Sequence, residues 1–325
     1  MCGSLLLAEV GLRTVAWAAG RPRGIHYDPD LGWRMVADLT KSGELWSNKT
    51  PCQTNSSGWR DAPFLPKRPG HRRILALGDS MTFGANVDYG ERFTELLEDE
   101  RTDVLNMGVC AYGPDQHVLV YEHEGHRYGA DIVLLQITHY NDLEDLRCAR
   151  KAGWSKPYFT MADDEPGASA LQLNRRSGFS SWPEQLRSSC YIAELAMQLL
   201  ERNRPAAEHA AAWRDDGDSG PATAPDTVPL FAALVERLDR AVTQDGAKLL
   251  VVFESNRDDE PASITRGNER MQAAVQRAGI QSFVLQLAAG GASDAELFLP
   301  CGHWSPAAQR IVAAQLNAEF ERRGW

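Results

Sequence analysis

The sequence lacks an excess of positive charge and lacks closely spaced cysteines. Its 34 Lys and Arg residues are outnumbered by 44 Asp and Glu residues, which gives a formal net charge of −10 at pH 7. No basic patch stands out, so we expect no nucleic-acid partner. The cysteines are scattered and include no CxxC pair: Cys2, Cys52, Cys110, Cys148, Cys190 and Cys301. This spacing argues against a zinc ribbon and against a dense disulfide framework.

A long uninterrupted hydrophobic run is also missing at the N-terminus. Residues 1–20 are largely apolar, but Glu9 and Arg13 interrupt them. The segment is too short and too charged to cross a bilayer, and it has no basic leader for a signal peptide. As the chain stands we expect a cytoplasmic protein; with a longer true N-terminus it would be membrane-anchored or exported. Leu5 and Leu12 fall on one helical face, which favours a short helix packed on the domain over an interfacial membrane anchor.

Segments with strand and helix patterns alternate from residue 73 onwards. The candidate strands cover residues 73–77, 104–109, 132–138, 249–254 and 282–287, and the candidate helices cover 93–100, 116–128, 183–202, 230–244, 266–278 and 306–322. Because the strands are continuously apolar, their alternation with helices implies a parallel sheet covered on both faces. We therefore predict an α/β fold, a three-layer α/β/α sandwich around a parallel five-stranded sheet.

An N-terminal extension and an insertion in the main domain fall outside this alternation of strands and helices. Residues 1–69 are predicted to form an N-terminal helix and a small β-rich extension packed on the core. Residues 70–325 are predicted to form the main domain, with an insertion at about 143–246. Within the insertion, 157–161 and 170–173 are predicted to pair as a hairpin across an acidic turn. The Ala-, Asp-, Gly- and Pro-rich stretch 205–229 is expected to be a mobile loop.

The first predicted core strand ends at Gly78-Asp79-Ser80. Enzymes of the α/β class expose a nucleophile on such a turn, because glycine permits a sharp bend and a helix start supplies backbone N–H groups. The alternative is that Asp79 or Ser80 merely caps the following helix.

Three further motifs follow at the ends of later core elements. They are NMGVCA at residues 106–111, HYND at 139–142 and PCGHWSP at 300–306. In a parallel sheet all of them lie along one edge, so a serine, backbone amides, an asparagine and a histidine can converge there. Acyl transfer needs this set: the histidine removes the serine proton, and the N–H groups stabilise the oxyanion.

The order of these four motifs resembles that of the SGNH (GDSL-type) hydrolase superfamily, from about Arg73 to the C-terminus. The segments TNSSGWRD at 54–61 and HWSPAAQRIVAAQL at 303–316 also resemble bacterial members that carry an N-terminal membrane segment. The resemblance implies the flavodoxin-like SGNH fold. It further implies that Ser80 is the nucleophile and an oxyanion donor, that Asn141 supplies the side-chain donor and that His303 is the general base.

Three departures from the family pattern stand out. The backbone donor glycine of the second motif aligns best with Ala111, with Gly108 as a neighbouring candidate. An alanine amide serves equally well if its φ is negative, and strain arises otherwise. The residue two positions before Asn141 is His139 instead of glycine, which adds bulk and a titratable group.

The third departure is the absence of the carboxylate that orients the histidine in the family. Its positions are occupied here by Pro300 and Cys301, so tautomer control and imidazolium stabilisation weaken by analogy. A carboxylate from elsewhere, or a backbone carbonyl, could replace it; the candidates are Asp294, Glu296 and Glu254. Possible third members or pocket residues are Cys301, Asp79, His139, Asp142 and Trp304.

We expect a serine esterase that acts on small acyl esters, including O-acetyl groups of a carbohydrate or metabolite, through an acyl-serine intermediate. Two alternatives stay open: an acyltransferase that uses the same site, and a catalytically degenerate binding protein. A nucleophilic Cys301–His303 pair is disfavoured, because residues two apart in a loop seldom face each other productively. No cofactor and no metal are expected, since HEGH at 123–126 lacks the HExxH spacing of zinc enzymes. Membrane association is left open.

Overall fold

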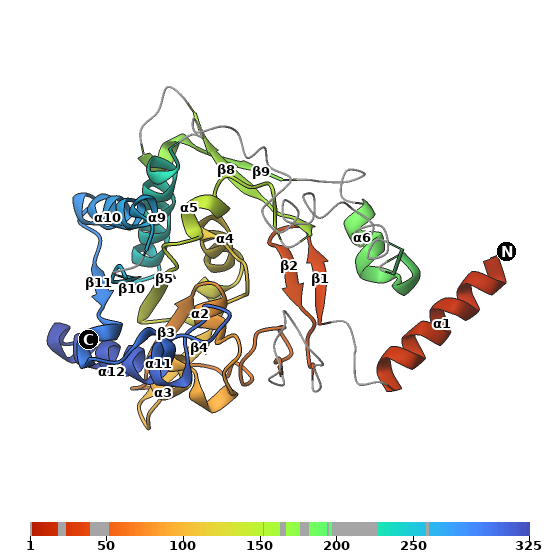
Figure 1. The fold of residues 1–325 in the computed structure, drawn as a ribbon, viewed down its shortest axis with the longest axis horizontal. Coiled ribbons are helices and arrows are strands. Elements are labelled where there is room, and N and C mark those ends of the chain that lie inside the picture. The colour runs from red at the N-terminus through yellow and green to blue at the C-terminus, as the bar shows by residue number, and fades with distance from the viewer. Residues whose placement is uncertain are drawn as a thin grey trace.

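The computed structural model describes residues 2–18, 24–39, 52–151, 153–162, 167–175, 182–193, 195–196, 226–257 and 260–325. Its centre is a five-stranded sheet in the order β11-β10-β5-β3-β4, in which every neighbouring pair is parallel (Figure 1). The strands are β3 (Arg72–Leu77), β4 (Thr102–Asn106), β5 (Ile132–Ile137), β10 (Lys248–Glu254) and β11 (Ser282–Leu285). This order confirms the predicted fold. It places the topological switch point, where ligands bind in such sheets, between β3 and β5.

Successive side chains of a strand point to opposite faces of the sheet, so both apolar faces must be covered, and helices cover each of them. Leu75 and Leu77 pack into a core with α4 (Pro114–His123), α9 (Val228–Gln244) and α10 (Ala262–Arg277). Ile74 and Ala76 pack into a second core with α3 (Phe93–Leu96), α11 (Asp294–Leu297) and α12 (Pro306–Arg323). Figure 1 shows these two helix groups on opposite sides of the sheet. The three-layer sandwich is therefore confirmed.

Several predicted ends were wrong by a few residues. Strand β4 ends at Asn106 instead of 109, and α3 ends at Leu96 instead of 100. The predicted helix 116–128 is α4 followed by a separate 3₁₀ turn, Gly125–Tyr128. Further 3₁₀ turns cover Tyr89–Glu91, Gly167–Ala170 and Leu287–Gly290.

The segment before the core includes a hairpin of β1 (Ile25–Asp28) and β2 (Gly32–Met35). Trp33 and Trp59 are buried in the same cluster as the central strands. The Trp33 indole N–H donates to the Cys110 carbonyl at 3.3 Å, and the Tyr112 hydroxyl donates to the Trp33 carbonyl. The hairpin thus packs on the loop that follows β4.

Helix α1 (Cys2–Ala18) does not bury the apolar face that the sequence predicts. Leu5 of that face is 55% exposed, and Leu12 is only partly buried. The helix is held by its charged residues instead: Glu9 accepts the backbone N–H groups of Tyr191 and Ile192 at 2.9 and 3.0 Å. Figure 1 shows α1 at the periphery, beyond α6 (Trp182–Ser189). Within the described residues, no helix has both the length and the apolarity to span a membrane.

The insertion begins after α5 (Asp142–Asp145) with two short antiparallel pairs. Strand β6 (Arg150–Lys151) pairs with β7 (Trp154–Ser155), and β8 (Tyr158–Met161) pairs with β9 (Leu171–Asn174). The β8–β9 pair confirms the predicted hairpin. Residues 163–166 of its acidic turn, 197–202 of the helix predicted at 183–202 and most of the loop predicted at 205–229 lie outside the described residues.

Candidate functional site

The residues Gly78, Asp79 and Ser80, which follow β3 and are called the GDS turn below, are tightly packed. A Cβ at Gly78 would collide with the Thr82 side chain, so only glycine fits there. Asp79 is the N-cap of α2 (Ser80–Phe83), and its Oδ1 accepts the Met81 N–H at 2.9 Å. Asp79 therefore does cap the helix, while Ser80 occupies its first position and is half-buried. Because α2 is a single turn, its dipole contributes little to the expected stabilisation of an oxyanion.

The loop after β4 packs against this turn. Asn106 donates through Nδ2 to the Thr82 carbonyl at 2.7 Å, and its Oδ1 accepts the Gly108 N–H at 2.9 Å. A Cβ at Gly108 would lie 2.5 Å from the Phe83 backbone nitrogen, which explains the glycine. Ala111 adopts a φ of +66°, the strained case that the sequence left open. Its N–H has no hydrogen-bond acceptor within the described part of the chain.

Asn141 joins the same turn from the end of β5. Its Nδ2 donates to Asp79 Oδ2 at 3.2 Å. The neighbouring Asp142 is fully buried and accepts the Thr138 N–H at 2.7 Å. Burial raises the pKa of Asp142 well above its ordinary value, and the negative charge of Asp79 adds to that shift.

The loop that carries His303 is anchored by the residues after it. Trp304 is 0% exposed, donates to Glu254 Oε1 at 2.5 Å and packs edge-on against Phe93. Ser305 caps α12 by accepting the Ala308 N–H at 3.2 Å. Trp304 therefore fixes the loop in the core, and its place at the wall of a substrate pocket stays a prediction.

His303 itself contacts an amide and a thiol. Its Nδ1 lies 3.2 Å from Asn86 Nδ2 and 3.3 Å from Cys301 Sγ, and Asn86 Nδ2 donates to that sulfur at 2.9 Å. Burial lowers the pKa of His303 below its ordinary value of 6.5, and the negative charge of Asp79 opposes this shift. In the part of the chain that the structure describes, the Ser80 hydroxyl makes no hydrogen bond to His303. Their pairing stays a prediction, since catalytic contacts are often long without substrate.

The carboxylates proposed to replace the missing one are engaged elsewhere or distant. Glu254 binds Trp304, and its second oxygen lies 3.7 Å from His139 Nδ1. Glu296 accepts the Ser293 N–H at 2.8 Å in a capping box. Asp294 lines a cavity of about 400 Å³ beside Glu254. Among the described residues, no carboxylate lies within ion-pair distance of His303.

His139 is buried between two carboxylates. Its Nε2 lies 2.7 Å from Glu260 Oε1, and Glu254 faces its other nitrogen. Since Glu254 also accepts the Trp304 indole N–H, His139 is linked to the residue that follows His303. His117 on α4 is also buried, which lowers its pKa to about 3.

Sequence reasoning missed Asn86. No motif pairs this residue with His303, which lies 217 positions further along the chain. The only signal was that Asn86 is an asparagine, a residue type that tolerates left-handed backbone. The φ of Asn86 is +66°.

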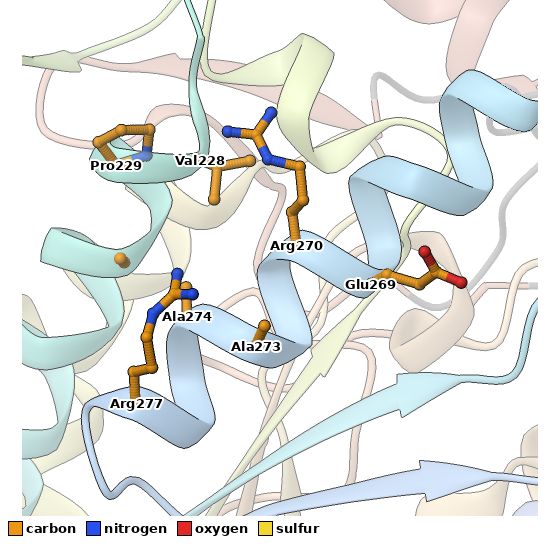
Figure 2. A pocket seen from close by; sticks show the side chains of 8 residues that line it. Val228, Pro229, Glu269, Arg270, Ala273, Ala274 and Arg277 are labelled. Atoms are coloured by element: carbon orange, nitrogen blue, oxygen red, sulfur yellow. The ribbon is translucent and has the colours of Figure 1, made fainter.

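A cavity of about 550 Å³ lies between α9 and α10, and its lining includes neither Asp79 nor Ser80. Figure 2 shows Arg270 and Arg277 projecting from α10 and Val228 and Pro229 at the start of α9. Arg270 pairs with Asp226. The described residues contain no group of three or more His, Cys, Asp or Glu side chains placed to hold a metal ion.

No protein-family model and no curated protein matches the chain. Among solved structures, it is similar to TesA, with a TM-score of 0.44 and 10% identity over 77% of this chain and 99% of that one. It is similar to the esterase EstA from Pseudoalteromonas sp., with a TM-score of 0.42 and 10% identity over 77% and 97%. It is also similar to a GDSL-like lipase from Bacteroides thetaiotaomicron, with a TM-score of 0.42 and 9% identity over 80% and 92%.

Proposed function

We propose that the chain is an SGNH-type serine ester hydrolase, with Ser80 as nucleophile and His303 as general base. One observation carries the proposal: the GDS turn meets both the Asn141 loop and the His303 loop. Asn141 donates to Asp79 in this turn, and His303 contacts Asn86 in the loop directly after α2. These three segments come from distant parts of the chain, and Ser80 lies between the two contact points in sequence.

The chemistry follows from the roles of these groups. Ser80 Oγ attacks the ester carbonyl carbon while His303 Nε2 takes the hydroxyl proton. The oxyanion is stabilised by the N–H of Ser80, the N–H of Ala111 and the Asn141 amide, each worth about a hundredfold or more in rate. Ala111 is favoured over Gly108, because the Gly108 N–H already donates to Asn106.

The tetrahedral intermediate then collapses, and His303 gives its proton to the leaving alcohol. A water molecule, deprotonated by the same histidine, hydrolyses the acyl-serine and restores the free enzyme. The substrates are small acyl esters, including O-acetyl esters of a carbohydrate or metabolite. An acyltransferase would use the same groups, with an alcohol in place of the water.

A fluorophosphonate probe tests the nucleophile, because only an activated serine reacts with it. The probe should label the wild type but not Ser80→Ala, and hydrolysis of p-nitrophenyl acetate should be lost in the same variant. Ser255→Ala is the matched control, since Ser255 follows strand β10, which β5 separates from β3, and should leave both readouts unchanged.

Three other outcomes would each contradict the proposal. Labelling that survives Ser80→Ala but disappears in Cys301→Ser would make the protein a cysteine enzyme. A wild type that neither reacts with the probe nor hydrolyses any ester of an acetyl-to-octanoyl panel would be a binding protein. Acyl transfer to an added alcohol that outruns hydrolysis would make it a transferase.

A further inference from the structure

The Nδ1 atom of His303, on the opposite side of the ring from the proposed base atom Nε2, has neighbours whose role is not yet explained. In the family that the chain resembles, a carboxylate stands there, and here the nearest groups to Nδ1 are Asn86 and Cys301. We propose that Asn86 is the positioning residue that holds His303 in the orientation and tautomer of a general base. This inference rests on the proposed function, because it assigns the role of the missing acid within that site.

The turn that carries Asn86 is rigidly built. The buried guanidinium of Arg60 donates to the carbonyls of Phe83, Gly84 and Val87, at 3.0, 2.5 and 2.8 Å. Backbone carbonyls before and after Asn86 thus accept three hydrogen bonds from the single side chain of Arg60. Since Arg60 belongs to the TNSSGWRD segment, the N-terminal extension helps to fix the position of the amide.

Helix α2 and the loop that follows it carry both Ser80 and Asn86. Ser80 and Asn86 are six residues apart, and the Ala85 N–H donates to the Ser80 carbonyl at 2.9 Å. A single short unit therefore presents the nucleophile and the group that orients the base. This arrangement couples the two positions more directly than a carboxylate on the His303 loop would.

The tautomer of His303 depends on which end of the Asn86 amide faces it. With Nδ2 towards the ring, Nδ1 accepts, the proton resides on Nε2 and His303 cannot take a proton from Ser80. A half-turn of the amide presents Oδ1, which accepts Nδ1–H and leaves the Nε2 lone pair free. The oxygen-facing arrangement is the productive one, and it also serves the imidazolium, whose Nδ1–H needs an acceptor.

The amide is a better partner for this role than the thiol. A carbonyl oxygen of an amide is a strong acceptor, whereas a thiol sulfur is a weak one. Cys301 is exposed, while Asn86 is half-buried and lies on the clamped turn. Because the amide carries no charge, it raises the affinity of the ring for a proton less than a carboxylate would, while burial lowers the pKa of His303 below its ordinary value.

Two substitutions test the role without straining the backbone, since glycine and aspartate both accept the left-handed conformation of residue 86. Asn86→Gly should lower kcat about 100-fold with KM nearly unchanged, less than the loss of a triad carboxylate because the amide is uncharged. Asn86→Asp should restore or exceed the wild-type kcat, and should move the acid limb of kcat/KM up by about one pH unit. Melting temperatures check that both variants fold.

Cys301→Ala separates the amide from the thiol. The proposal expects a change in kcat of less than about threefold, as for the loss of a weak contact. A large loss in Cys301→Ala together with full activity in Asn86→Gly would assign the role to the thiol and overturn the proposal. Equal kcat and an unmoved acid limb in Asn86→Gly and Asn86→Asp would also overturn it.

A spectroscopic readout keeps the test independent of activity. The ¹⁵N shifts of the His303 ring, assigned by comparison with His303→Gln, report which nitrogen carries the proton in the neutral form. The wild type and Asn86→Asp should hold the proton on Nδ1, and Asn86→Gly should shift the population towards Nε2. If the wild type shows no esterase activity, the proposed function fails, but these shifts still decide the role of Asn86. Identical tautomer populations in all three proteins would exclude it.

Discussion

The serine side and the histidine side of the candidate site are held in different ways. Asp79 is buried, caps the helix of the nucleophile and accepts from Asn141, and glycines on both sides allow close packing. His303 stands on a loop that is anchored through Trp304, Ser305 and the bond from the Leu299 N–H to the His303 carbonyl, and its ring contacts an amide and a thiol. The first region matches the SGNH motif pattern that the sequence resembles, and the second departs from that pattern at positions 300 and 301.

This difference teaches where the site tolerates change. Backbone packing around Ser80 is determined by the sheet, because a displacement there would break contacts to Thr82, Phe83 and Asn106. The ring of His303 contacts two side chains at Nδ1, Asn86 and Cys301, and several residue types can supply such a contact. We therefore expect substitutions on the serine side to be severe and substitutions beside His303 to be graded.

The largest effect is expected from Asn141→Ala, which removes the proposed side-chain donor to the oxyanion. We expect kcat to fall by about 100- to 1,000-fold, as for the loss of one oxyanion donor elsewhere. KM should change little, because the donor binds the transition state more strongly than the ester. Steady-state kinetics on p-nitrophenyl acetate measures this. A loss confined to KM would place Asn141 in ground-state binding instead.

The second prediction tests the packing of the serine side through Gly108→Ala. The new Cβ would lie 2.5 Å from the Phe83 nitrogen, so the backbone of α2 must move. We expect a loss of unfolding free energy of about 2–3 kcal/mol, in the range of overpacking substitutions, and slower fluorophosphonate labelling. Urea denaturation measures the first effect.

Gly90→Ala is the control for this substitution. A Cβ at Gly90 has no atom within 4 Å, and the residue has no positive φ, so its stability should change by less than about 0.5 kcal/mol. Equal losses in the two variants would show that the contact with α2 is not what requires Gly108.

The third prediction sharpens the histidine side through Cys301→Asp. A carboxylate at this position can accept Nδ1–H and stabilise the imidazolium, so kcat/KM should rise about tenfold, a fraction of the effect of a native triad carboxylate. The base works in its neutral form, and burial lowers the pKa of His303 below 6.5. The acid limb of the wild-type profile should therefore lie below pH 6.5, and the variant should move it upward by about one unit.

The pH profile of kcat/KM on one ester decides this prediction. If Glu254, Glu296 or Asp294 oriented the ring, the added carboxylate would compete with it, and turnover would stay level or fall. If Cys301→Asp leaves the acid limb unmoved, residue 301 does not face the imidazole in solution.

The fold was predictable from the sequence because it depends on pattern. Five apolar strands alternate with helices, and each predicted strand overlaps an observed one, since burial on both faces leaves an unambiguous hydrophobic run. The parallel arrangement of the strands also followed, because helices separate them along the chain. The ends of β4 and α3 were missed, because local turn contacts terminate elements and leave weak sequence signals.

The candidate site was predictable only where its residues directly follow core strands. The contacts of Asp79 and Asn141 come from motifs that follow β3 and β5, so the parallel sheet brings them together. Asn86 could not be found in this way, because its partner lies on a distant loop and neither residue type specifies the pairing. The positive φ of Ala111 was equally hidden, since alanine gives no signal of left-handed backbone.

The smallest effect concerns this strained residue. Ala111 has a φ of +66°, which costs an L-residue about 1–2 kcal/mol. Glycine would remove the strain but loses about 0.5–1 kcal/mol more conformational entropy on folding. Ala111→Gly should therefore raise the unfolding free energy by up to about 1 kcal/mol, and it should keep kcat within about twofold, because the backbone N–H stays in place.

Ala62→Gly supplies the comparison, because Ala62 is exposed and has no positive φ, so only the entropic loss applies. That variant should be destabilised by about 0.5–1 kcal/mol, opposite in sign to Ala111→Gly. Thermal and urea denaturation of both variants measure the difference. If both lose stability equally, residue 111 is unstrained, and the serine side does not store energy at the proposed oxyanion donor. If Ala111→Gly gains stability with activity unchanged, the strain is a by-product of alanine at a turn that glycine fits better.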